Sequence, residues 1–137
     1  MPPLSSAELA YVQQWLEVAD LDLAAAERMY VDNPAAFGYP IPFSCQQAIE
    51  KYCKGVLLAE GRVFRKTHDL PFLLQQLAPT VPFTDVKLDE ADLLSDYAVD
   101  VRYPPHTRIS VPEMQEALRI ARYFQLRLRP LILAVLP

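Results

Sequence analysis

The strongest constraint on the fold is an apolar repeat near the N-terminus that fits one face of a long helix. Its members recur at alternating intervals of three and four residues: Leu9, Val12, Leu16, Ala19, Leu23, Ala26 and Tyr30. Side chains at this spacing form a continuous stripe along an α-helix, as in the helices of a bundle. Ser5 and Glu8 form a capping box at its start, and Asn33-Pro34 ends it because the residue before a proline avoids helical backbone angles. The sequence therefore predicts a helix of about six turns.

Two further helices are predicted in the middle of the chain. The first of them runs from about Phe43 to Ala59, and Gly61 is suited to the left-handed position after its end. The second is short, with Thr67 or Asp69 as its cap and Pro71 in its first turn.

Two more helices are predicted in the C-terminal half. Asp89 can cap one of them, which must stop near Arg102 because residues 103–105 (Tyr-Pro-Pro) cannot continue an α-helix. The last helix begins with a second capping box at Ser110, and Pro130 is expected to kink or end it. No stretch shows the sustained alternation of apolar and polar residues that is typical of strands.

The length and composition of the chain fit one folded domain. A chain of 137 residues can bury roughly two-thirds of its unfolded surface, and 52% apolar residues with a net charge of −4 exclude a disordered chain. No apolar run approaches the roughly 20 residues that span a bilayer, and the N-terminus lacks the features of a signal peptide. We therefore expect an all-α, antiparallel up-and-down bundle of about five helices over residues 1–137, located in the cytoplasm.

Glycine and cysteine content excludes several kinds of site. The three glycines are too few and too scattered for a P-loop or a dinucleotide-binding fingerprint. Cys45 and Cys53 lie in one predicted helix with Cα atoms about 12 Å apart, too far for a disulfide, and we expect both to be buried thiols. No ligand spacing indicates a metal, and no other cofactor is predicted.

The segment around Arg102 offers the clearest candidate chemistry. Arg102 and His106 could converge on a phosphodiester, with Arg102 stabilising its charge and His106 moving a proton. The alternative is an ion pair between Arg102 and a nearby aspartate, with His106 exposed in a loop. Tyr97 and Tyr103 flank Arg102 and either pack with their hydroxyls at the surface or stack on a base.

A basic cluster stands out in this otherwise acidic chain: Lys51, Lys54, Arg62, Arg65 and Lys66. It is either a solvated helix end and loop or a site for phosphate or RNA. The negative net charge argues against non-specific binding of nucleic acid, which depends on neutralising phosphates.

Four stretches in a fixed order carry a family pattern. They are residues 15–24 (WLEVADLDLA), residues 43–58 (FSCQQAIEKYCKGVLL), residues 68–70 (HDL) and residues 97–104 (YAVDVRYP). Their order and spacing resemble those of the HEPN family (higher eukaryotes and prokaryotes nucleotide-binding domain). The resemblance extends over nearly the whole chain.

The resemblance implies a helical bundle, usually a homodimer with a cleft at the interface. Family members are often encoded beside a minimal nucleotidyltransferase, with which they form a toxin–antitoxin pair. Some are metal-independent RNases that use an arginine and a histidine a few residues apart. Here only Tyr103, Pro104 and Pro105 separate Arg102 from His106, a shorter gap than in those members. Members with Arg-Tyr-Pro resemble nucleotide-binding or partner-binding versions, in which Arg102 would contact a phosphate.

These observations lead to one main hypothesis and two alternatives. The main hypothesis is a dimeric helical module that binds a nucleotide or a nucleotidyltransferase partner. Its expected anion contacts and cleft residues are Lys51, Lys54, Arg102, Tyr97 and Tyr103. The first alternative is a metal-independent endoribonuclease toxin with Arg102 and His106 as catalytic residues. The second is a purely structural dimerising domain.

Overall fold

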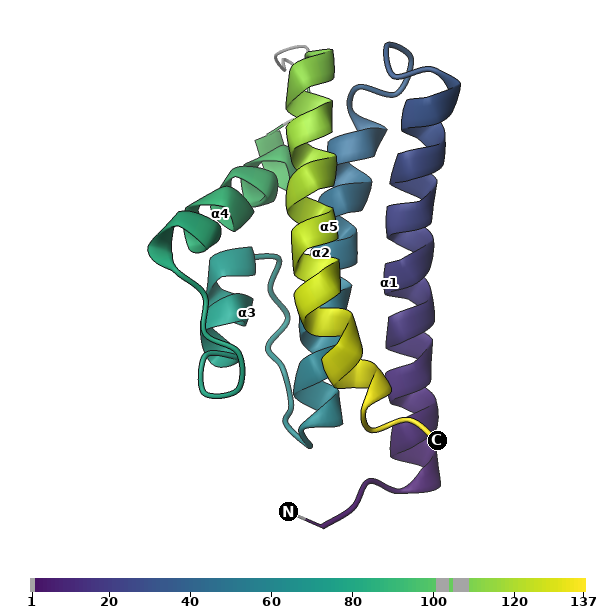
Figure 1. Cartoon of the computed structure of the whole chain (residues 1–137), viewed down its shortest axis with the longest axis vertical. Helices are drawn as coiled ribbons and strands as arrows, with labels where there is room; N and C mark the ends of the chain where they lie inside the picture. The colour runs from purple at the N-terminus through teal and green to yellow at the C-terminus, as the bar shows by residue number, and fades with distance from the viewer. Residues whose placement is uncertain (1, 101–103, 105–108) are drawn as a thin grey trace.

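The structure is a computed structural model that describes residues 2–100, 104 and 109–137, without the side chains of residues 98–100. The described residues form five helices and no strand, as expected (Figure 1). The helices are α1 (Ser6–Asp32), α2 (Pro40–Ala59), α3 (Leu70–Gln76), α4 (Asp85–Asp100) and α5 (Val111–Leu133).

The predicted apolar stripe of α1 is confirmed. Its buried residues are Val12, Leu16, Ala19, Leu23 and Ala26, while the two ends of the stripe, Leu9 and Tyr30, are half-buried. The predicted capping box is also present, because the Ser5 hydroxyl accepts a hydrogen bond from the Glu8 backbone and the Glu8 carboxylate accepts one from the Ser5 backbone.

Helix α2 begins three residues earlier than the predicted start at Phe43. Pro40 and Pro42 lie in its first turn, where backbone N–H groups have no partner within the helix, so the prolines start the helix rather than precede it. The end of α2 is as predicted. Gly61 has a positive φ of 73°, and the backbone N–H groups of Gly61 and Arg62 bond to the carbonyls of Leu58 and Leu57.

The start of α4 corrects another prediction. Asp89 does not cap this helix; it lies one turn inside it. Thr84 takes the capping position, because its hydroxyl accepts a hydrogen bond from the Lys87 backbone at 3.3 Å. The cap of α3 is Asp69, one of the two predicted residues, and its carboxylate accepts from the Phe72 backbone at 3.1 Å.

Helix α5 starts at the predicted capping box of Ser110 and Glu113 but does not end at Pro130. It continues to Leu133, and Figure 1 shows its last turns bending toward α1, in line with a kink at proline. The apolar C-terminal segment packs on its own bundle. Ile132 is fully buried, while Leu131, Val135 and Leu136 are partly buried against the core.

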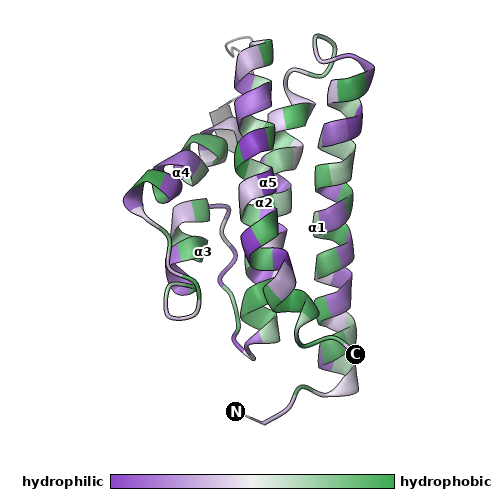
Figure 2. Ribbon diagram, in the orientation of Figure 1, coloured by the Kyte–Doolittle hydropathy of each residue, from purple (hydrophilic) through white to green (hydrophobic). Residues whose placement is uncertain are grey.

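Helix α2 is the centre of the molecule and contacts each of the other four helices. Helices α1, α2, α4 and α5 alternate in direction along the chain, with α3 in the connection between α2 and α4 (Figure 1). Hydrophilic and hydrophobic residues alternate along the helices, and the C-terminal end of α5 is hydrophobic (Figure 2). Among the described helices, none has the length and apolar character to cross a membrane.

Candidate functional site

The predicted pair Arg102 and His106, together with Tyr103, lies outside the described residues. Of the predicted site residues that the structure describes, Tyr97 is the nearest to this pair in the sequence. It lies near the end of α4, and its hydroxyl donates to the Glu113 carboxylate of α5 at 3.2 Å. Burial, followed by the negative charge of Glu113, raises the pKa of Tyr97 to about 12. This contact therefore joins the two helices on either side of the Arg102 segment.

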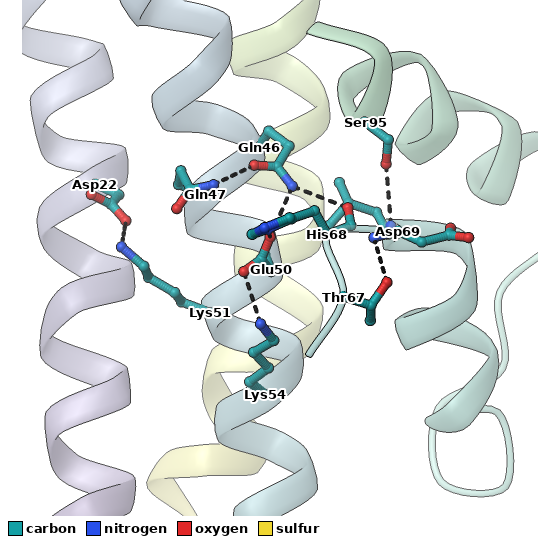
Figure 3. Close-up of polar contacts among 11 residues, drawn as sticks. Asp22, Gln46, Gln47, Glu50, Lys51, Lys54, Thr67, His68, Asp69 and Ser95 are labelled. Atoms are coloured by element: carbon teal, nitrogen blue, oxygen red, sulfur yellow. Dashed lines mark hydrogen bonds and ion pairs between the residues drawn. The ribbon is translucent and has the colours of Figure 1, made fainter. Parts of the chain in front are cut away.

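The predicted anion contact Lys51 is paired inside the protein. Its ammonium group lies 2.5 Å from the carboxylate of Asp22 on α1, and both side chains are half-buried. The pair connects α1 to α2 (Figure 3).

Lys54, the other predicted anion contact, has a different set of neighbours. Its side chain is only 8% exposed, and its ammonium group lies 2.9 Å from Glu50 one turn earlier on α2. The same ammonium group lies 5.9 Å from the ring centroid of Trp15 and 5.3 Å from that of Phe64, both within cation–π range. The described contacts join neither lysine to Tyr97, so the structure does not bring these three predicted residues together.

A polar cluster under the α2–α3 connection (residues 60–69) was missed by the sequence analysis. Glu50 accepts hydrogen bonds from Lys54 at 2.9 Å and from Gln46 at 3.1 Å, and its other contact is Nδ1 of His68 at 2.7 Å (Figure 3). Gln46 also donates to the backbone carbonyl of His68 at 3.3 Å. Burial alone would raise the pKa of Glu50, but hydrogen bonds from Lys54, His68 and Gln46 hold it below its ordinary value.

The sequence does carry one signal for this cluster, a spacing of four residues between its members on α2. Gln46, Glu50 and Lys54 are successive members of an i, i+4 series, which places them along one line of α2. The contribution of His68 had no such signal, because it reaches Glu50 from a connection without regular structure. The basic cluster was expected to be either solvated or anion-binding, whereas Lys54 is buried.

A second polar cluster joins α1, α2 and α5. The Asp20 carboxylate accepts a hydrogen bond from the hydroxyl of the buried Tyr52 at 2.5 Å. It also accepts hydrogen bonds from the Arg129 guanidinium at 3.0 Å. Gln125 donates to the Tyr52 hydroxyl at 3.0 Å. A cavity of about 420 Å³ adjoins this cluster, and Leu126, Pro130 and Leu133 complete its lining.

The cysteines and the acidic residues add no further chemistry to the described part of the chain. Cys45 and Cys53 are free and buried, as predicted. Burial raises the pKa of the Cys45 thiol to about 12, which keeps it protonated and unreactive at neutral pH. No three His, Cys, Asp or Glu residues among those described are grouped so that they could hold a metal ion.

Comparison with known proteins identifies the family. The model of the HEPN domain matches residues 12–128. The chain is also similar to the crystal structure of TT1696 from Thermus thermophilus, with 27% identity, a TM-score of 0.75, and coverage of 88% of this chain and 97% of that one. A second solved structure, ST0689, is an archaeal HEPN homologue with the same coverage, 22% identity and a TM-score of 0.66, and it supports the fold alone. No curated protein matches the chain. Because the family model extends from α1 into α5 over most of the sequence, the chain belongs to the HEPN domain family.

Proposed function

We propose that the protein is a nucleotide-binding HEPN module that acts as a homodimer and pairs with a minimal nucleotidyltransferase in a toxin–antitoxin system. The observation that carries this proposal is the match to the HEPN domain over residues 12–128. HEPN domains are generally nucleotide-binding or RNase-like, and they often dimerise. The nucleotidyltransferase partner is proposed from the resemblance of the sequence to the family.

Because Lys51 and Lys54 already pair with carboxylates, we propose Arg102 as the main anion contact. For Lys51 or Lys54 to bind a phosphate, the phosphate would have to replace Asp22 or Glu50 as the partner. Replacing the buried Glu50 contact of Lys54 is costly, and Lys51 already has a carboxylate partner, so these two lysines contribute less. The hydroxyl of Tyr97 donates to Glu113 of α5. In the proposed complex, Tyr97 and Tyr103 line the nucleotide cleft.

Replacing Arg102 by alanine is therefore expected to weaken nucleotide binding by about ten-fold or more, because a hydrogen bond to a charged phosphate is lost. Isothermal titration calorimetry with ATP measures the change. The matched control is Arg28→Ala, since Arg28 is an exposed arginine that pairs only with Asp32 of its own helix among the described residues. Equal affinity of the wild type and the Arg102→Ala variant would contradict the role of Arg102.

The second candidate function is RNA cleavage, which the Arg102 and His106 pair in the sequence favours. The proposal of a binding module predicts no RNA cleavage by micromolar protein in the presence of EDTA. The control is the Arg102→Ala/His106→Ala double variant. Cleavage by the wild type that disappears in the double variant would instead establish the endoribonuclease.

A further inference from the structure

The buried polar residues of the described chain are concentrated at one place. Gln46, Glu50 and Lys54 are the buried polar or charged residues among those described, and all three belong to the cluster that includes His68. Removing charges from water is costly, and a buried ion pair adds little stability compared with apolar residues of similar size. This polar arrangement holds His68 in place through hydrogen bonds, which apolar residues could not do.

The geometry determines which ring nitrogen of His68 carries a proton. The hydrogen bonds to Glu50 hold its pKa low, so its carboxylate is ionised near neutral pH and can only accept. The 2.7 Å contact therefore requires a proton on Nδ1, and Nε2 is the ring nitrogen left to contact another group. The hydrogen bond from Gln46 to the His68 carbonyl fixes the backbone as well.

His68 is oriented by buried groups but is itself accessible. Its side chain is 71% exposed, and no hydrogen bond to Nε2 is present among the described residues. Arg65 and Lys66, on the same connection, are also exposed, and neither has a carboxylate partner in the described part of the chain. Arg65 lies over the ring of Phe72, with its guanidinium carbon 5.0 Å from the ring centroid. An accessible, oriented imidazole on the same connection as two cations without a described carboxylate partner suits an anionic oxygen.

We propose that His68 contacts a phosphate oxygen of the bound nucleotide through Nε2, with Glu50 as the positioning residue. In the bound state the ring is protonated, so Nδ1–H donates to Glu50 and Nε2–H donates to the phosphate. The Glu50 carboxylate stabilises the positive charge of this doubly protonated ring. This inference rests on the proposed nucleotide binding and adds a second phosphate contact to that of Arg102.

Imidazole ¹⁵N chemical shifts test the inference. In the free wild-type protein, Nδ1 of His68 is expected to carry a proton that is hydrogen-bonded to Glu50. Addition of AMP is expected to shift the Nε2 resonance of His68, whereas adenosine, which lacks the phosphate, should not. Assignment is direct, because the chain has two histidines and a His68→Asn variant removes one signal.

His68→Asn also separates phosphate binding from a purely structural role. The asparagine amide can replace Nδ1–H as the donor to Glu50 but has nothing at the position of Nε2. We expect the free energy of unfolding to stay close to that of the wild type and the affinity for AMP to be about ten-fold weaker. Unchanged AMP affinity in His68→Asn, or AMP binding that leaves the His68 shifts unmoved, would overturn this inference while nucleotide binding stands. No perturbation of any resonance by AMP would overturn both.

Discussion

Replacing Glu50 by leucine is expected to lower the free energy of unfolding by about 3–5 kcal/mol, the largest effect that we predict. Lys54 would then be a buried cation with no carboxylate partner, since its side chain is 8% exposed and Glu50 is its ion-pair partner among the described residues. Gln46 and His68 would lose the acceptor that they share. Urea unfolding followed by circular dichroism measures the change.

The double variant Glu50→Leu/Lys54→Met is the matched control for this effect. It removes both charges and leaves apolar side chains of similar length, so it should recover most of the lost stability. Stability of Glu50→Leu within about 1 kcal/mol of the wild type would contradict the assigned role of the ion pair.

The wild type should also lose stability in acid. A carboxylate with a lowered pKa stabilises the fold above about pH 4.5, its ordinary pKa, and this contribution disappears as Glu50 is protonated below that.

Replacing Asp20 by alanine is expected to cost about 2–3 kcal/mol. Most of this comes from Tyr52, which is fully buried and would lose the acceptor for its hydroxyl hydrogen. The partly exposed ion pair with Arg129 contributes the smaller share, because water screens it. The same unfolding measurement applies.

Asp22→Ala is a matched control for Asp20→Ala, since Asp22 is the same residue type two positions away on α1. Its described contact is the single ion pair with Lys51, so its loss should cost about 1 kcal/mol. If the two variants lose equal stability, the buried hydroxyl of Tyr52 does not depend on Asp20 as we describe.

The fold was largely predictable because its signals are local. The stripe of α1, the capping boxes at Ser5 and Ser110, and Gly61 after α2 each depend on residues within a few positions of one another, and the structure confirms them. The errors concern competing local signals. Thr84 caps α4 in place of Asp89, and α2 begins at Pro40 rather than at Phe43.

The polar clusters could be predicted only in part, because they join residues distant in the sequence. The i, i+4 spacing of Gln46, Glu50 and Lys54 was visible, but the contact of Glu50 with His68 crosses from a helix to an irregular connection. The contact of Asp20 with Arg129 joins opposite ends of the chain and depends on how α1 and α5 pack. Arg102 and His106 lie outside the described residues, so their pairing remains a prediction from sequence and family.

The most direct test of the account is a titration of the ¹⁵N-labelled wild-type protein with ATP and other nucleotides, followed by backbone amide chemical shifts. The account predicts saturable shifts that include the region of Tyr97 and the α2–α3 connection, and it predicts that Arg102→Ala weakens them. If saturating nucleotide leaves every amide shift unchanged and does not raise the melting temperature, nucleotide binding by this protein is contradicted.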